Sequence, residues 1–125
     1  MNARQILVVE DNERNMKLFC DLLQAWGFGT LEATTGERAV EVALEHRPDL
    51  VLMDIQLPDI DGVEALNRLR AHGRFAAVPV LALTAQAMEG DRERFLSAGF
   101  DGYISKPVDV TDFVATVKRY CEDGG

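Results

Sequence analysis

The stretch Leu50-Val51-Leu52-Met53-Asp54, followed by Ile55-Gln56-Leu57-Pro58, is an unbroken apolar run that ends on a carboxylate and a proline-bearing loop. Such a run, bounded by turn residues, is typical of a strand buried on both faces, as in a parallel sheet. Open α/β sheets bind ligands at the carboxyl edge of their strands. We therefore expect Asp54 to lie at a functional site. The alternative, a helix or turn cap, leaves the polar ends of the other strands unexplained.

Composition favours one globular domain. The chain has 125 residues, 47% of them hydrophobic, which allows a core without disulfide or metal staples. No long apolar run or signal peptide is found, so we expect a cytoplasmic protein without a membrane segment. A formal net charge of −8 argues against direct nucleic-acid binding. Cys20 and Cys121 are expected to be reduced, partly buried thiols.

Strands and helices are predicted to alternate along the chain. The predicted strands are residues 5–9, 30–33, 50–54, 80–84 and 102–105. Predicted helices cover residues 13–26, 62–71, 89–97 and 109–121, and a further helix is capped by Thr35 and stopped by Pro48. Asn12 is the predicted cap of the first helix. Trp26 and Val110 are assigned to the apolar faces of the first and last helices.

This alternation predicts an α/β fold: a flavodoxin-like, doubly wound sheet of five parallel strands in the order 2-1-3-4-5, with five helices. The strand order reverses between the first and third strands. Glu10 and Asp11, which follow the first strand, should therefore lie beside Asp54. Thr84 and Lys106 end the fourth and fifth strands at the same edge.

These residues together suit phosphoryl chemistry. Clustered carboxylates raise one another's pKa unless a cation lies among them. Oxygen ligands in a hydrated site suit Mg²⁺, and a carboxylate can attack phosphorus to give an aspartyl phosphate. Lys106 and Thr84 can supply a charge and a hydroxyl donor to the added oxygens. Each residue alone is weak evidence, but their occurrence together at the ends of four strands favours a site for phosphoryl chemistry.

With these residues, the chain resembles the receiver domain of two-component response regulators. The resemblance covers roughly residues 4–121 and rests on Asp11-Asn12-Glu13-Arg14-Asn15, Leu52-Met53-Asp54-Ile55-Gln56-Leu57-Pro58, Asp61-Gly62, Leu83-Thr84-Ala85 and Ser105-Lys106-Pro107. Asn15-Met16-Lys17-Leu18-Phe19 is similar to single-domain cell-cycle regulators of this family. The resemblance implies a CheY-like fold and one receiver domain over residues 1–125, with no output domain.

The resemblance also implies the ligands and the chemistry. Asp54 is the implied phosphoacceptor, taking the phosphoryl group from a histidine of a kinase or phosphotransferase. Asp11, Asp54 and the backbone carbonyl of Gln56 are implied to bind Mg²⁺, with Mn²⁺ as an alternative. Glu10 is implied to act through metal-bound water, although many relatives have two aspartates where this chain has Glu10-Asp11.

The phosphate-binding and switching residues are implied in the same way. They are Thr84, Ala85 and Lys106, together with Tyr103 as the aromatic residue that changes rotamer with Thr84. The Lys106–Pro107 peptide bond is expected to be cis, as in relatives.

Partner contacts are predicted on the first helix and near the crevice. Asn15, Leu18 and Pro107 are expected to contact the kinase or phosphotransferase, with Leu18 as core filler the equal alternative. The expected output surface is the fourth helix, fifth strand and fifth helix, since the fourth helix has few apolar anchors.

Three functions are weighed. The first is a phospho-accepting switch, not an enzyme, that controls a downstream protein; a receiver cut from a longer chain is its variant. The second is a haloacid-dehalogenase-type phosphatase, which usually needs a second acid where Gln56 stands and places its pair after the first strand. The third is a flavin-binding module, but the acidic crevice lacks a phosphate-cradling loop after the first strand.

Overall fold

The computed structural model describes residues 4–73, 77–85 and 91–123, and its strands form one parallel sheet. The order β2-β1-β3-β4-β5 confirms the predicted topology. The strands are β1 (Gln5–Val9), β2 (Gly29–Ala33), β3 (Leu50–Asp54), β4 (Val80–Thr84) and β5 (Gly102–Ser105). The helices are α1 (Glu13–Ala25), α2 (Gly36–His46), α3 (Gly62–Arg70), α4 (Asp91–Ala98) and α5 (Val110–Asp123).

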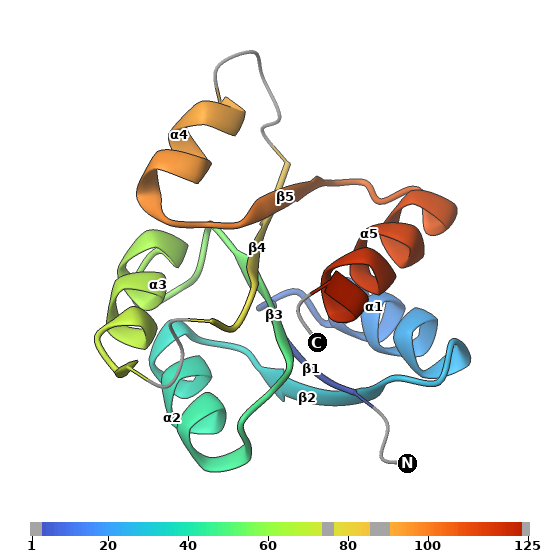
Figure 1. Ribbon diagram of the computed structural model, residues 1–125, viewed down its shortest axis with the longest axis horizontal. Coiled ribbons are helices and arrows are strands. Elements are labelled where there is room, and N and C mark those ends of the chain that lie inside the picture. The colour runs from blue at the N-terminus through green and yellow to red at the C-terminus, as the bar shows by residue number, and fades with distance from the viewer. Residues whose placement is uncertain (1–3, 74–76, 86–90, 124–125) are drawn as a thin grey trace.

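Helices cover both faces of the sheet (Figure 1). Helices α1 and α5 lie on one face, and α2, α3 and α4 lie on the other. Successive strand residues point to opposite faces. In β1, Ile6 and Val8 pack in the cluster with α1 and α5, whereas Leu7 and Val9 pack in the cluster with α2 and α3. This two-sided burial explains why the strands read as continuous apolar runs.

Polar caps begin the helices where the sequence predicts them. The Asn12 side chain accepts a hydrogen bond from the Asn15 amide at 3.0 Å, and Thr35 caps α2 in the same way. Gly27, with φ of 88°, follows the end of α1 in a left-handed conformation that glycine adopts without strain. Both cap predictions are confirmed.

Two assignments to the helix faces were wrong. Trp26 is the C-cap of α1 and is 54% exposed, with the Lys118 ammonium 4.2 Å from its ring centroid. The chain leaves the helical path there, so the helical spacing no longer decides which way the side chain points. Val110 is 49% exposed and is the first residue of α5, where the helix begins.

Smaller differences concern element ends and the cysteines. Strand β2 begins at Gly29, one residue earlier than predicted. The predicted start of the fourth helix, residues 89–90, lies outside the described residues. Cys20 and Cys121 are both buried and form no disulfide, as expected of reduced thiols. Within the described ranges, no helix combines the length and apolar character needed to cross a bilayer.

Strand register brings the functional strand ends to one edge. Asp54 pairs with Leu83 in β4, so Thr84 follows immediately beyond it. Thr84 in turn pairs with Ser105, and Lys106 comes next. On the other side of β3, Val9 pairs with Met53, which places Glu10 level with Asp54.

Candidate functional site

A crevice of about 430 Å³ opens at the carboxyl edge of the sheet. Four strand ends contribute to its wall, as the topology predicts. The predicted residues that line the crevice are Glu10, Asp11, Asn15, Asp54, Gln56, Thr84, Ala85 and Lys106.

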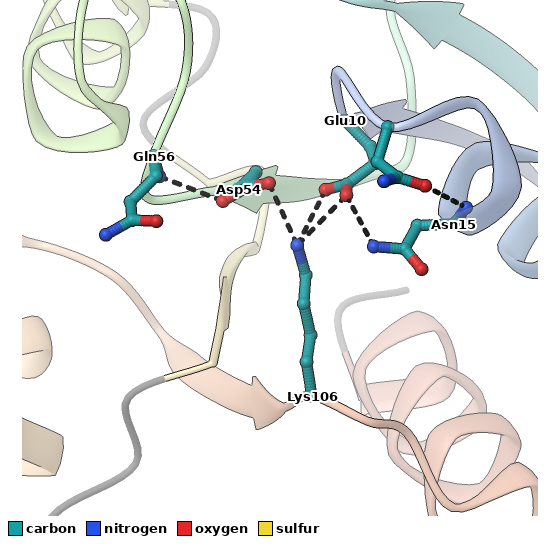
Figure 2. Close-up of polar contacts among 6 residues, drawn as sticks. Glu10, Asn15, Asp54, Gln56 and Lys106 are labelled. Atoms are coloured by element: carbon teal, nitrogen blue, oxygen red, sulfur yellow. Dashed lines mark hydrogen bonds and ion pairs between the residues drawn. The ribbon is translucent and has the colours of Figure 1, made fainter.

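Asp54 is held at the floor of the crevice by backbone contacts. It is the last residue of β3 and is 6% exposed. Its Oδ1 accepts a hydrogen bond from the Gln56 amide at 2.9 Å (Figure 2). Gly62, the first residue of α3, donates its amide to the Ile55 carbonyl at 2.9 Å. A Cβ on Gly62 would lie 2.6 Å from the Asp54 carbonyl oxygen, so this close approach requires glycine.

Lys106 joins the carboxylates of Glu10 and Asp54 (Figure 2). Its Nζ donates to Glu10 Oε1 at 3.0 Å, to Glu10 Oε2 at 2.9 Å and to Asp54 Oδ2 at 2.9 Å. Partial burial lowers the pKa of Lys106, but the hydrogen bonds to Glu10 and Asp54 outweigh this and raise it. Lys106 is therefore a fixed positive charge between the first and third strands.

Glu10 is almost completely buried, at 1% exposure. Burial and the neighbouring Asp54 raise the pKa of Glu10 to about 7, against the opposing effects of Lys106 and Asn15. Asn15 donates its side-chain amide to Glu10 Oε1 at 2.9 Å. One cation does not fully compensate the two carboxylates, so the crevice favours further positive charge.

The acidic groups have the composition of a divalent-cation site. Single oxygens of Glu10, Asp11 and Asp54 all lie within 4.8 Å of one another. Asp11 is exposed, so this oxygen cluster is open to solvent on one side. Carboxylate ligands in a hydrated site suit Mg²⁺, which keeps several waters. Gln56 lines the same crevice, and its backbone carbonyl stays a proposed ligand.

Thr84, Ala85 and Tyr103 differ in their position relative to the crevice. Thr84 is 5% exposed and lines the crevice with the exposed Ala85. The Lys106 amide donates to the Thr84 carbonyl at 2.8 Å, which keeps the ends of β4 and β5 together. Tyr103 is half-buried and lies outside the crevice lining, with its ring 6.2 Å from that of Phe95 in α4. Its change of rotamer stays a prediction.

The predicted partner contacts lie around the rim. Leu18 is 43% exposed, which rules out the core-filler alternative. Pro107 is exposed, and the Lys106–Pro107 bond is cis. Asn15 lines the crevice and bonds to Glu10, a contact that the sequence did not predict.

Arg94 of α4 also lines the crevice, and the sequence interpretation did not predict it. Arg94 lies ten residues beyond Thr84, in a polar helix without a clear apolar stripe. Arg94 directly precedes Phe95 in the sequence. It reaches the crevice because of where α4 packs on the sheet.

Comparison with known proteins identifies the family to which this chain belongs. The family model described as "Response regulator receiver domain" matches residues 6–118. A curated polar-differentiation response regulator DivK from Brucella anthropi is 48% identical over 120 residues, covering 96% of this chain and 98% of the relative. The DivK of Brucella ovis is 47% identical over 121 residues, covering 97% of this chain and 98% of the relative.

Solved structures give the same result. A putative response regulator from Chloroflexus aurantiacus superposes with a TM-score of 0.91 at 28% identity, covering 97% of this chain and 99% of that one. The receiver domain of a sensor histidine kinase from Pseudomonas aeruginosa has a TM-score of 0.88 at 36% identity, with coverage of 96% and 98%. That structure has a magnesium ion coordinated in its active-site cleft. With its sheet order, its crevice residues and these matches, the chain belongs to the response regulator receiver domain family.

Proposed function

We propose that this protein is a phospho-accepting switch in which Asp54 receives a phosphoryl group from a histidine of a kinase or phosphotransferase. The observation that carries the proposal is the 2.9 Å contact between Lys106 Nζ and Asp54 Oδ2 beside two further carboxylates. A nucleophilic carboxylate, a fixed cation and a group of oxygen ligands are the parts that phosphoryl transfer to aspartate needs.

In the transfer, a carboxylate oxygen of Asp54 attacks the phosphorus of a phosphohistidine. A P–O bond forms while the P–N bond breaks, and its electron pair stays on the imidazole nitrogen. Lys106 balances charge on the transferred oxygens in this proposal, and the Thr84 hydroxyl and the Ala85 amide, which line the same crevice, are the proposed donors to them. Asp11, Asp54 and the Gln56 carbonyl, with Glu10 through water, would hold Mg²⁺ or Mn²⁺, which would further neutralise the phosphoryl charge.

The output is proposed to be a protein–protein interaction, without enzymatic turnover of a substrate. Two curated relatives are named polar-differentiation response regulators, so a role in polar differentiation or the cell cycle is proposed here. Those alignments cover 98% of each relative, so these relatives consist of little more than the matched domain. Asn15, Leu18 and Pro107 are the proposed contacts with the phosphodonor, and Thr84 with Tyr103 the proposed switch. A cytoplasmic location is part of the proposal.

Phosphorylation by phosphoramidate, a small P–N donor, tests this function without a partner protein. Wild type should gain label only when Mg²⁺ is present, and Asp54→Asn should gain none. Asp112→Asn is the matched control, because Asp112 is exposed in the first turn of α5 and does not line the crevice. Equal labelling of wild type and Asp54→Asn would contradict the proposal, as would rapid hydrolysis of phosphate esters.

A further inference from the structure

The loop between β3 and α3, residues 55–61, is hydrogen-bonded to α2, a helix outside the crevice lining. Asp59 Oδ1 accepts from the Gly36 amide at 2.8 Å, and Asp59 Oδ2 accepts from the Glu37 amide at 2.9 Å. The first amides of an α-helix have no partner within the helix, and a carboxylate is favoured at this positive end. Asp59 therefore acts as a clamp between the loop and the start of α2.

Helix α2 is a firm support for this clamp. Its residues Ala39, Val42 and Ala43 are buried in the core cluster that also contains β1 residues. Gly36, at the start of α2, is buried, and a Cβ there would collide with the side chain of Ile60 in the same loop. Helices α2 and α3, which flank the loop, lie side by side (Figure 1). The loop thus approaches a packed helix as closely as glycine permits.

The clamped loop also carries the proposed backbone ligand of the metal, Gln56. The Gln56 amide donates to Asp54 Oδ1 at 2.9 Å, so this end of the loop lies against the phosphoacceptor. Only Leu57 and Pro58 separate Gln56 from Asp59. Proline fixes its own φ and restricts the residue before it, so few dihedral angles can absorb a movement between the two. A displacement at Asp59 therefore reaches the Gln56 carbonyl.

We propose that Asp59 is a positioning residue for the divalent-cation site: by holding the loop on α2, it sets the position of the Gln56 carbonyl. This inference rests on the proposed function and concerns the same crevice. Asp59 lies outside the crevice lining, so it acts through the loop and is not itself a ligand. Removing a group that holds a metal ligand in place typically weakens metal affinity about 10–100-fold.

The test compares Asp59→Ala with Thr35→Ala. Thr35 Oγ1 accepts a hydrogen bond from the Arg38 amide at 3.1 Å, so it caps the same helix without bonding to the loop. Both variants weaken the start of α2, and their comparison separates positioning of the loop from loss of helix stability. Mg²⁺ is the probe, titrated into metal-free protein and followed by amide NMR shifts. Phosphoramidate labelling gives the Mg²⁺ concentration for half-maximal rate as a second readout.

Asp59→Ala should raise the dissociation constant of Mg²⁺ about tenfold, the lower end for groups that orient metal ligands, and the half-maximal Mg²⁺ concentration should rise with it. Asp59→Asn should lose less, because its side-chain oxygen can still accept from one of the two amides. Thr35→Ala should bind Mg²⁺ as wild type does.

Wild-type Mg²⁺ affinity in Asp59→Ala, or an equal loss in Thr35→Ala, would overturn the positioning role of Asp59. If Asp59→Ala does not fold, Asp59→Asn decides the question, and wild-type affinity in that variant would overturn the role. Wild type that binds no Mg²⁺ would overturn both this inference and the proposed function. Mg²⁺ binding that depends on Asp59, without any labelling of Asp54, would overturn the proposed function alone.

Discussion

Replacing Gly62 by alanine should disturb both the stability and the chemistry of the crevice. A Cβ on Gly62 would lie 2.6 Å from the Asp54 carbonyl oxygen and 2.9 Å from the Ile55 Cα. Real Cβ contacts essentially never fall below 3.0 Å, so backbone must move by roughly 0.4 Å at the Asp54 carbonyl. Both neighbouring atoms belong to the backbone, so no side-chain rotation relieves the clash.

The expected cost follows from this geometry. Forcing an extra methyl group into a packed region typically costs about 1–3 kcal/mol. Alanine recovers up to about 1 kcal/mol through its higher helix propensity, less at the first position of a helix. We therefore expect a net loss of about 1–2 kcal/mol in the free energy of unfolding, together with slower phosphorylation, since the displaced backbone carries the phosphoacceptor.

Urea unfolding followed by circular dichroism measures the stability, and phosphoramidate labelling measures the chemistry. Gly73→Ala is the control, because a Cβ on Gly73 meets no atom within 4 Å and its φ is not positive. Its free energy of unfolding should lie within about 0.5 kcal/mol of the wild-type value, and it should be labelled at the wild-type rate. If Gly62→Ala is as stable as Gly73→Ala and equally well labelled, the close approach of α3 to Asp54 has no role in holding the site.

Three further outcomes are expected. In EDTA, the free energy of unfolding should fall as pH rises from 4.5 through about 7, because Glu10 keeps its proton in the folded state over that range and loses it in the unfolded state. Urea titrations measure this slope, which Glu10→Gln or saturating Mg²⁺ should flatten. Burial raises the pKa of Asp59, but hydrogen bonds from the amides of Gly36 and Glu37 outweigh this effect and lower the pKa to about 2. Stability from Asp59 should thus be lost as pH falls from 3.8 to about 2, and acid unfolding of Asp59→Asn should lack this component. The free energy of unfolding of Leu18→Ala should lie within about 0.5 kcal/mol of the wild-type value. The variant should accept the phosphoryl group from phosphoramidate at the wild-type rate but more slowly than wild type from a phosphohistidine protein. Wild-type rates with both donors would remove Leu18 from the partner surface.

The topology could be predicted from the sequence because a sheet covered on both faces leaves a simple pattern. Runs such as residues 50–54 are apolar throughout, and helical spacing separates them, so the parallel order follows from the handedness of the crossovers. The convergence of Glu10, Asp54, Thr84 and Lys106 follows in turn, because parallel strand ends share one edge.

What the sequence did not predict depends on tertiary placement. Periodicity assigned Trp26 and Val110 to buried faces, but these residues lie at helix ends and are about half exposed. The Asn15–Glu10 hydrogen bond depends on how α1 sits over the end of β1. Arg94 reaches the crevice only because of where α4 packs, which its own sequence does not specify.

Mass-spectrometric mapping of the modified residue tests the central claim most directly. Wild-type protein is treated with phosphoramidate and Mg²⁺, digested rapidly and compared with an untreated sample. The account predicts the added mass of one phosphoryl group on the peptide that contains Asp54, and none in Asp54→Asn. A phosphoryl group on Asp11, Glu10 or any other residue of the wild type, with Asp54 unmodified, would contradict it.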